Sequence, residues 1–258
     1  MSQVFYEVVP QSCVFDFMLW CLKLRILAIG NIHGDFELFS HLFRVIESEG
    51  RFDVVFITGN IGRYSTTKKV MEFISKFGYE VISVYGSDDD YYLKQLLRRG
   101  EHKLWNGVIL NLGGLIRVHG YKILGIGGLK GSGKYWYEWR ERTILKIIEN
   151  VSGRKIDFIL AYEFPKNYSP ECSGKEVCGR FSLKELVDEV QPKFYIGGRN
   201  HGEPKGYLYD NGTIIVESGS IKTKSGESYA TVINVAKKVV DVYKLVDKNM
   251  SLASRYRF

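Results

Sequence analysis

Short polar turns follow five apolar segments that are typical of buried strands. Four of these turns carry glycine and occupy residues 30–34, 59–60, 86–89 and 197–202, and the fifth follows residues 158–162. The carboxyl ends of parallel strands meet at one edge of a sheet, so we expect these turns to share a cleft. Imidazole and carboxylate groups bind metal ions, whereas guanidinium groups bind phosphate. The first turn would be typical of a metal site if Asn31 were an aspartate.

The spacing of apolar residues predicts a chain that alternates strands and helices and then becomes almost entirely β. Expected strands are residues 23–30, 52–58, 80–85, 107–112, 115–118, 122–127, 158–162, 193–197, 206–209, 213–217, 230–235 and 239–245. Expected helices are residues 35–48, 66–77, 91–99, 135–150 and 182–190, the last with Ser182 as N-cap and Glu185 in capping-box spacing. This order predicts two sheets packed face to face with helices outside, a four-layer α/β/β/α sandwich.

The order of the turns resembles the calcineurin-like metallophosphoesterases, whose pattern is Asp-x-His-Gly, Gly-Asp, Gly-Asn-His-Asp, a histidine after a strand, and Gly-His-x-His. The resemblance runs from about Lys23 to Leu245 and includes the turn Glu217-Ser218-Gly219-Ser220. It implies the four-layer fold, and a site where two divalent metals clamp a phosphoryl group and activate water. The corresponding positions are Asn31, His33, Asn60, Ser87, Asp88, Asp89, Tyr162, Arg199 and His201.

Most of these positions depart from the residues that the family uses as metal ligands. Asn31 and Asn60 replace aspartates, the second of them the metal-bridging one, and Ser87-Asp88 replaces the Asn-His pair. Tyr162 and Arg199 replace histidines, whereas His33, Asp89 and His201 match the pattern. A neutral amide is a poor bridge between two dications, and a guanidinium adds a fixed cation. The sequence therefore predicts a degenerate metal site in a pseudoenzyme that serves as a binding or scaffold protein and needs no cofactor.

Other chemistries of the cleft remain open at this stage. Arg199, His33 and His201 could bind phosphate or a nucleotide without metal. Arg199 could instead pair with Asp88 or Asp89 and plug the pocket. A single metal on His33, Asp88 and His201 would give a phosphodiesterase or nuclease with an unorthodox site, using a divalent ion such as manganese. The partner is accordingly an unknown protein or a phosphate-bearing ligand.

The charge of the chain permits a nucleic-acid partner without demanding one. The sequence has 36 Lys and Arg against 29 Asp and Glu, a net charge of +7, spread along the chain. Residues 128–135 match G-x-x-x-x-G-K but have tyrosine in place of Ser or Thr, which favours a flexible loop over a nucleotide cradle. Lys130, Lys134, Trp136 and Arg140 are candidate nucleic-acid contacts. Alternatively, Trp136, Trp139 and Ile144 pack on the sheet.

The chain is expected to form one domain over residues 22–247, with an N-terminal extension at 1–21 and a frayed tail at 248–258. One possibility for the extension is an added edge strand. The other is that residues 1–17 do not belong to the native chain, because Met18 immediately precedes the first strand and could be the true start. No apolar run is long enough to span a membrane, and a cytoplasmic location is expected. Cys172 and Cys178 could bond to each other, but reduced thiols are expected unless the source is a thermophile, for which the composition gives a weak hint.

Overall fold

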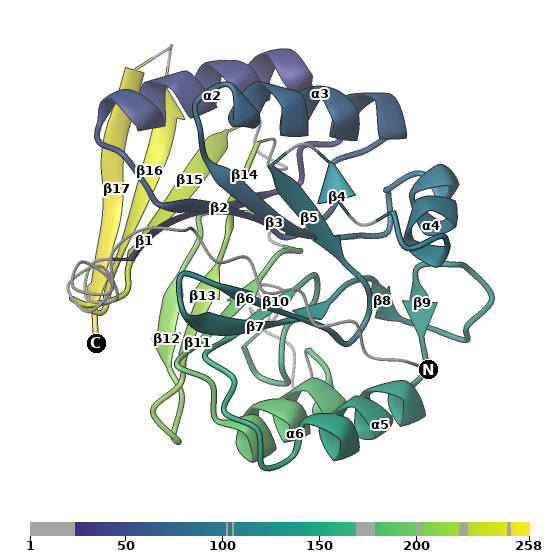
Figure 1. The fold of residues 1–258 in the computed structure, drawn as a ribbon. Coiled ribbons are helices and arrows are strands. Elements are labelled where there is room, and N and C mark those ends of the chain that lie inside the picture. The colour runs from purple at the N-terminus through teal and green to yellow at the C-terminus, as the bar shows by residue number, and fades with distance from the viewer. Residues whose placement is uncertain are drawn as a thin grey trace.

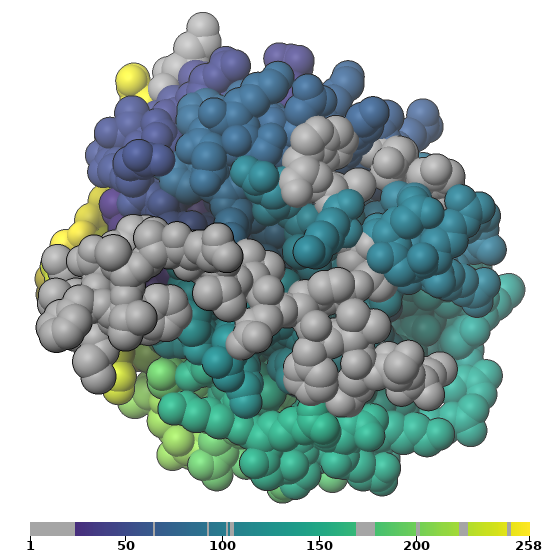
Figure 2. Space-filling view, in the orientation of Figure 1, coloured from purple at the N-terminus to yellow at the C-terminus, as the bar shows by residue number. Residues whose placement is uncertain are grey.

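The computed structural model describes residues 24–101, 103–104, 106–168, 179–199, 202–221, 227–246 and 249–258. Two sheets lie face to face, and helices cover the outer face of each (Figure 1). Figure 2 shows the same order of layers on the surface, from α2 and α3 at the top to α5 and α6 at the bottom. The predicted four-layer α/β/β/α sandwich is confirmed.

The larger sheet has the strand order β17-β16-β15-β1-β2-β3-β5-β4, with β14 paired to β1. Its members are β1 (Arg25–Gly30), β2 (Val54–Ile57), β3 (Glu80–Val84), β4 (Lys103–Leu104), β5 (Gly107–Leu110), β14 (Gly219–Ser220), β15 (Ser228–Asn234), β16 (Val239–Val246) and β17 (Asn249–Arg257). β1, β2, β3 and β5 are parallel, whereas β15, β16 and β17 continue the sheet with antiparallel pairing. The parallel strands therefore direct their carboxyl ends to one edge.

The smaller sheet has the order β12-β13-β11-β10-β7-β6. Its strands are β6 (Gly114–Val118), β7 (Tyr121–Ile126), β10 (Phe158–Ala161), β11 (Phe194–Gly197), β12 (Gly206–Leu208) and β13 (Ile214–Glu217). A separate parallel pair joins β8 (Leu129–Lys130) to β9 (Glu138–Trp139). The helices are α2 (Phe36–Ser48), α3 (Tyr64–Ser75), α4 (Tyr91–Arg98), α5 (Glu141–Val151) and α6 (Phe181–Val190).

Three apolar cores hold the layers together, one beneath each pair of helices and one between the sheets. α2 shows how the sequence produces this packing. Its N-cap Asp35 accepts the Leu38 N–H at 3.1 Å through Oδ1. Phe39, Leu42 and Phe43 then recur at helical spacing and are fully buried against the larger sheet.

Two expectations about helix starts are wrong. Residues 135–140 are not helical: Tyr135–Tyr137 form a turn, Glu138–Trp139 form β9, and α5 begins at Glu141. Ser182 is not an N-cap, because that position belongs to Arg180 and the Ser182 N–H donates to Glu141 Oε1 at 2.9 Å. Contacts with distant residues, rather than local helical periodicity, decide the conformation of both segments.

The expected frayed tail is also wrong. Residues 249–257 form β17, which pairs with β16 along its whole length. The expected extension over residues 1–21, the cysteines Cys172 and Cys178, and the candidate ligand His201 lie outside the described residues. Within the described residues, no helix combines the length and apolarity needed to cross a membrane.

Candidate functional site

The polar turns of the two sheets meet at one edge, where the sequence predicts a cleft, and we call this cluster of turns the cleft region. The Asn31 N–H donates to the Gly59 carbonyl at 3.1 Å, and the His33 N–H to the Asn60 carbonyl at 2.8 Å. The Gly198 N–H donates to the carbonyl of Ala161, the residue that precedes Tyr162. The backbone thus brings together turns that lie far apart in sequence.

Asn31 and Asn60 occupy the centre of this region with left-handed backbone, φ 49° and 54°, and are almost fully buried. Asparagine is one of the few side-chain-bearing residues that tolerate this conformation. The choice of residue therefore suits the turn, and it places two neutral amides at the centre of the site.

The orientation of the Asn60 amide is fixed by its neighbours. The backbone N–H of Asp88 donates to Asn60 Oδ1 at 3.0 Å, so this oxygen faces the backbone. The amide nitrogen Nδ2 faces the other way and donates to Asn31 Oδ1 at 3.2 Å and to the Tyr162 hydroxyl at 2.8 Å. Asn60 therefore presents N–H donors, not an oxygen ligand, to the position between Asn31 and Tyr162.

A chain of hydrogen bonds continues from Tyr162 toward the surface. Its hydroxyl lies 2.9 Å from Ser87 Oγ, which lies 3.3 Å from Asp88 Oδ1. The other Asp88 oxygen is 2.8 Å from His33 Nδ1, and both of these side chains are partly exposed. Burial raises the pKa of Tyr162 despite the hydrogen bonds from Ser87 and Asn60, so the phenol stays protonated. The polar side chains of the cleft region are thus partners of one another.

Asp89 is buried and turned toward the backbone. Its carboxylate accepts the N–H groups of Asn60 at 3.0 Å, Gly62 at 2.8 Å and Gly86 at 2.6 Å. Burial nevertheless raises the pKa of Asp89, and the backbone donors offset this only in part. This carboxyl group ties the turn after β2 to the turn after β3.

Arg199 belongs to an ion-pair cluster that the sequence analysis did not identify. The sequence suggested Asp88 or Asp89 as the partner of Arg199. In the structure Arg199 Nη1 forms an ion pair with Glu163 Oε1 at 2.9 Å. Glu163 is buried, with 4% of its side chain exposed, and also binds Arg180 through Nε and Nη2. The available signal was a charged residue two positions after the end of the buried strand β10.

The four nucleic-acid candidates do not form a helical stripe. Lys130 pairs with Glu141 at 2.5 Å, and Arg140 Nε donates to the Ser132 carbonyl at 2.7 Å. Trp136 packs on Tyr85 with ring centroids 5.1 Å apart, and Lys134 lies over the ring of Tyr135. Trp139 and Ile144, two of the residues that the alternative interpretation packs on the sheet, are buried in the core under α5.

The segment that matches G-x-x-x-x-G-K is built around an internal anion. Glu138 Oε2 accepts the N–H groups of Gly133 at 3.0 Å and Lys134 at 2.9 Å, and the Ser132 hydroxyl at 3.2 Å. Desolvation would raise the pKa of Glu138, but these donors outweigh it and the pKa is lowered. The loop thus places a carboxylate of the chain where a phosphate cradle would hold its ligand.

A family model described as calcineurin-like phosphoesterase matches residues 24–201. The chain belongs to the calcineurin-like phosphoesterase family. The structure of GAP50, the anchor in the inner membrane complex of Plasmodium, is 13% identical over 92% of this chain and 89% of its own, with a TM-score of 0.53. Vps29 of Entamoeba histolytica, complexed with Zn²⁺, is 16% identical over 91% and 99%, with a TM-score of 0.48. A Mycoplasma pneumoniae phosphatase is 12% identical over 91% and 94%, with a TM-score of 0.49. No curated protein sequence matches the chain.

The described residues do not fit the two-metal site of this family of phosphoesterases. Asn60, which the resemblance assigns to the metal-bridging position, directs Nδ2 toward Asn31 and Tyr162. Tyr162, which the resemblance assigns to the position of a histidine ligand, offers a phenol instead of an imidazole. Asp89 directs its oxygens to backbone donors. Within the described ranges, which exclude His201, no group of three or more His, Cys, Asp or Glu side chains is arranged to hold a metal ion.

Proposed function

We propose that this member of the calcineurin-like phosphoesterase family acts by binding and does not hydrolyse phosphoesters by the two-metal route. The observation that carries the proposal is the orientation of the Asn60 amide, with Oδ1 accepting the Asp88 N–H and Nδ2 donating to Asn31 and Tyr162. A bridging metal ligand must offer an anionic oxygen to both cations.

Turning the Asn60 amide over would direct its oxygen into the site, but this orientation is disfavoured. Oδ1 would then face Asn31 Oδ1 and the Tyr162 hydroxyl, and Nδ2 would face the Asp88 N–H, so two donors would oppose each other. A buried donor without an acceptor costs about 1–3 kcal/mol. The amide therefore favours the orientation that excludes a cation, and the hydrogen-bond chain through Tyr162 and Ser87 supports it.

Metal content and turnover test the proposal together. Protein dialysed against Mn²⁺ and then freed of loose metal should retain less than one ion per chain by mass spectrometry. It should not hydrolyse bis(p-nitrophenyl) phosphate above the rate of a His33→Ala variant. Retention of two ions per chain, with turnover that His33→Ala abolishes, would overturn the proposal.

A second candidate function is metal-free binding of a phosphate group at the cleft. Two guanidinium groups, Arg180 and Arg199, gather at the buried carboxylate of Glu163. A guanidinium can bind phosphate in place of a metal. Inorganic phosphate should then raise the melting temperature, and Arg199→Ala should abolish that rise while Arg142→Ala, on the exposed face of α5, preserves it. An equal change in melting temperature of the wild type and Arg199→Ala on addition of phosphate would rule out this second function.

A further inference from the structure

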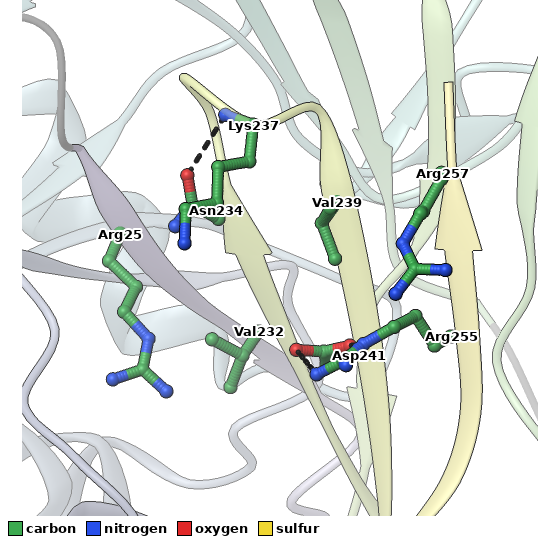
Figure 3. A pocket seen from close by; sticks show the side chains of 8 residues that line it. All are labelled: Arg25, Val232, Asn234, Lys237, Val239, Asp241, Arg255 and Arg257. Atoms are coloured by element: carbon green, nitrogen blue, oxygen red, sulfur yellow. Dashed lines mark hydrogen bonds and ion pairs between the residues drawn. The ribbon is translucent and has the colours of Figure 1, made fainter.

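A concave site lies on the larger sheet, at the opposite end of β1 from Asn31. Four cationic side chains line it, from Arg25, Lys237, Arg255 and Arg257 (Figure 3). Its volume of about 440 Å³ falls within the range of small-molecule sites. We call it the basic pocket. Two of these arginines, Arg255 and Arg257, lie in the segment expected from the sequence to be a frayed tail.

The strand register explains why the cations gather here. Arg25 of β1 pairs with Asn234, Asn234 with Val239, and Val239 with Arg257, so these four side chains form one row on the same face. The neighbouring row runs from Val232 through Asp241 to Arg255. Lys237 lies in the turn between β15 and β16, and its backbone N–H donates to Asn234 Oδ1 at 3.0 Å.

The pocket has more positive than negative charge. Asp241 is the one carboxylate among its lining residues, and Arg255 binds it with Nε at 2.5 Å and Nη2 at 3.0 Å. Within the described residues, Lys237 and Arg257 form no ion pair and are exposed. Three cationic groups therefore remain without a carboxylate partner inside the pocket.

Part of the pocket is held in place before any ligand arrives. Arg25 Nη1 donates to the Arg51 carbonyl at 3.0 Å, and Asp241 fixes Arg255. Val232 and Val239 provide apolar lining between the charged groups, as Figure 3 shows. A rigid sheet with oriented guanidinium groups loses little conformational entropy on binding.

We propose that the basic pocket binds a small anion carrying more than one phosphate group. Guanidinium groups match phosphate oxygens with paired hydrogen bonds, and several cations that face one pocket favour a multivalent ligand. The cations surround one hollow instead of following an extended groove, which favours a compact ligand over a nucleic-acid strand. This site is independent of the function proposed for the cleft.

Calorimetric titration with inorganic tripolyphosphate, at constant ionic strength, tests the proposal. The wild type should bind tripolyphosphate saturably, with at least one equivalent per chain, and Arg257→Ala and Lys237→Ala should each weaken this binding at least fivefold. Both residues are exposed, so these variants should fold, which a melting curve verifies. Arg142→Ala removes the same charge from the exposed face of α5 and should leave the affinity unchanged.

Three outcomes would overturn the proposal. The first is no saturable binding of tripolyphosphate by the wild type. The second is an equal loss of affinity in Arg142→Ala and Arg257→Ala, which would indicate diffuse attraction by net charge. The third is binding of a single-stranded oligonucleotide that depends on Arg257 and that tripolyphosphate does not displace.

Discussion

At the carboxyl end of β1, Asn31 lies in a cleft region whose polar side chains bond to one another, whereas at the amino end Arg25 lies in a pocket where cations outnumber carboxylates. The two residues are six positions apart, roughly 20 Å along a strand. The cleft region has groups of the kinds that catalysis uses, but their hydrogen-bonding capacity is largely spent within the protein. The basic pocket has no catalytic motif and retains charge without local partners. A motif at a strand end is therefore a weaker guide to ligand binding than the balance of donors, acceptors and charges around it.

The largest expected effect comes from placing a charge at the centre of the cleft region. Asn60→Asp should lower the free energy of unfolding at pH 7 by about 3–5 kcal/mol, the cost of an uncompensated buried charge. The new carboxylate could not donate to Asn31 Oδ1 and the Tyr162 hydroxyl as the Asn60 amide does. It would also lie next to buried Asp89. Urea denaturation measures the loss, which should shrink at pH 4. The exposed control Asn249→Asp should change stability by less than about 0.5 kcal/mol. A stable Asn60→Asp protein that retains two Mn²⁺ ions would contradict this view of the site.

The next effect is a pH dependence of stability from Glu217, at the carboxyl end of β13 and opposite Gly197 in register. Burial raises its pKa from 4.5 to about 7, although the Tyr207 hydroxyl and the Lys205 N–H bond to it. Between these values the unfolded chain ionises first, so stability should fall as pH rises, by on the order of 3 kcal/mol in total. Below pH 4.5 the group is protonated in both states and contributes no slope.

Glu217→Gln should flatten this part of the stability profile. Denaturation of the wild type and the variant between pH 4 and pH 8 gives the difference, and Glu101→Gln, in an exposed turn, serves as the control. Parallel profiles for the wild type and Glu217→Gln would show that this edge of the smaller sheet accommodates an ionised carboxylate, and would weaken the contrast with the basic pocket.

A smaller effect should follow removal of one hydroxyl from the hydrogen-bond chain. Tyr162→Phe leaves an Asn60 N–H and the Ser87 hydroxyl without their buried partner, which should cost about 1–3 kcal/mol. Tyr168→Phe is the matched control, because among the described residues the side chain of Tyr168 contacts Tyr207 and Tyr209 through its ring. Thermal melting compares the two variants. Equal stability of both would show that the chain through Tyr162 contributes little.

The smallest expected effect is a gain in the basic pocket. Asp241→Asn removes the one carboxylate of the lining and releases Arg255 for an anion. Tripolyphosphate affinity should rise about fivefold, which corresponds to about 1 kcal/mol. The same titration on Asp188→Asn, whose side chain pairs with Lys184 on α6, should show no gain. A lower affinity of Asp241→Asn would indicate that Arg255 needs Asp241 for its orientation.

The sequence predicts the layers better than it predicts side-chain partners. Apolar periodicity places β1 and α2 within two residues, because burial against the sheet and the Asp35 cap are local signals. The aromatic and basic residues at 135–140 have helical spacing, but the Glu138 carboxylate gathers the N–H groups of Gly133 and Lys134, and the segment becomes a turn and a strand.

The residues corresponding to the family's site could be identified from motif order, but their bonding could not. That Arg199 meets Glu163 depends on the adjacency of β10 and β11, which bring together residues 36 positions apart. The basic pocket depends on a register across four strands, and its contribution from 249–257 lies in a strand that the sequence analysis took for a frayed tail. Side-chain partners across strands follow from the register, which local periodicity does not give.

Anomalous scattering from crystals grown in Mn²⁺ tests the central claim most directly. No pair of manganese peaks should appear between Asn31, Asn60 and Tyr162, and Asn60 Oδ1 should still accept the Asp88 N–H while Nδ2 faces the tyrosine hydroxyl. Two peaks about 3.5–4 Å apart, with an Asn60 oxygen bound to both, would contradict it.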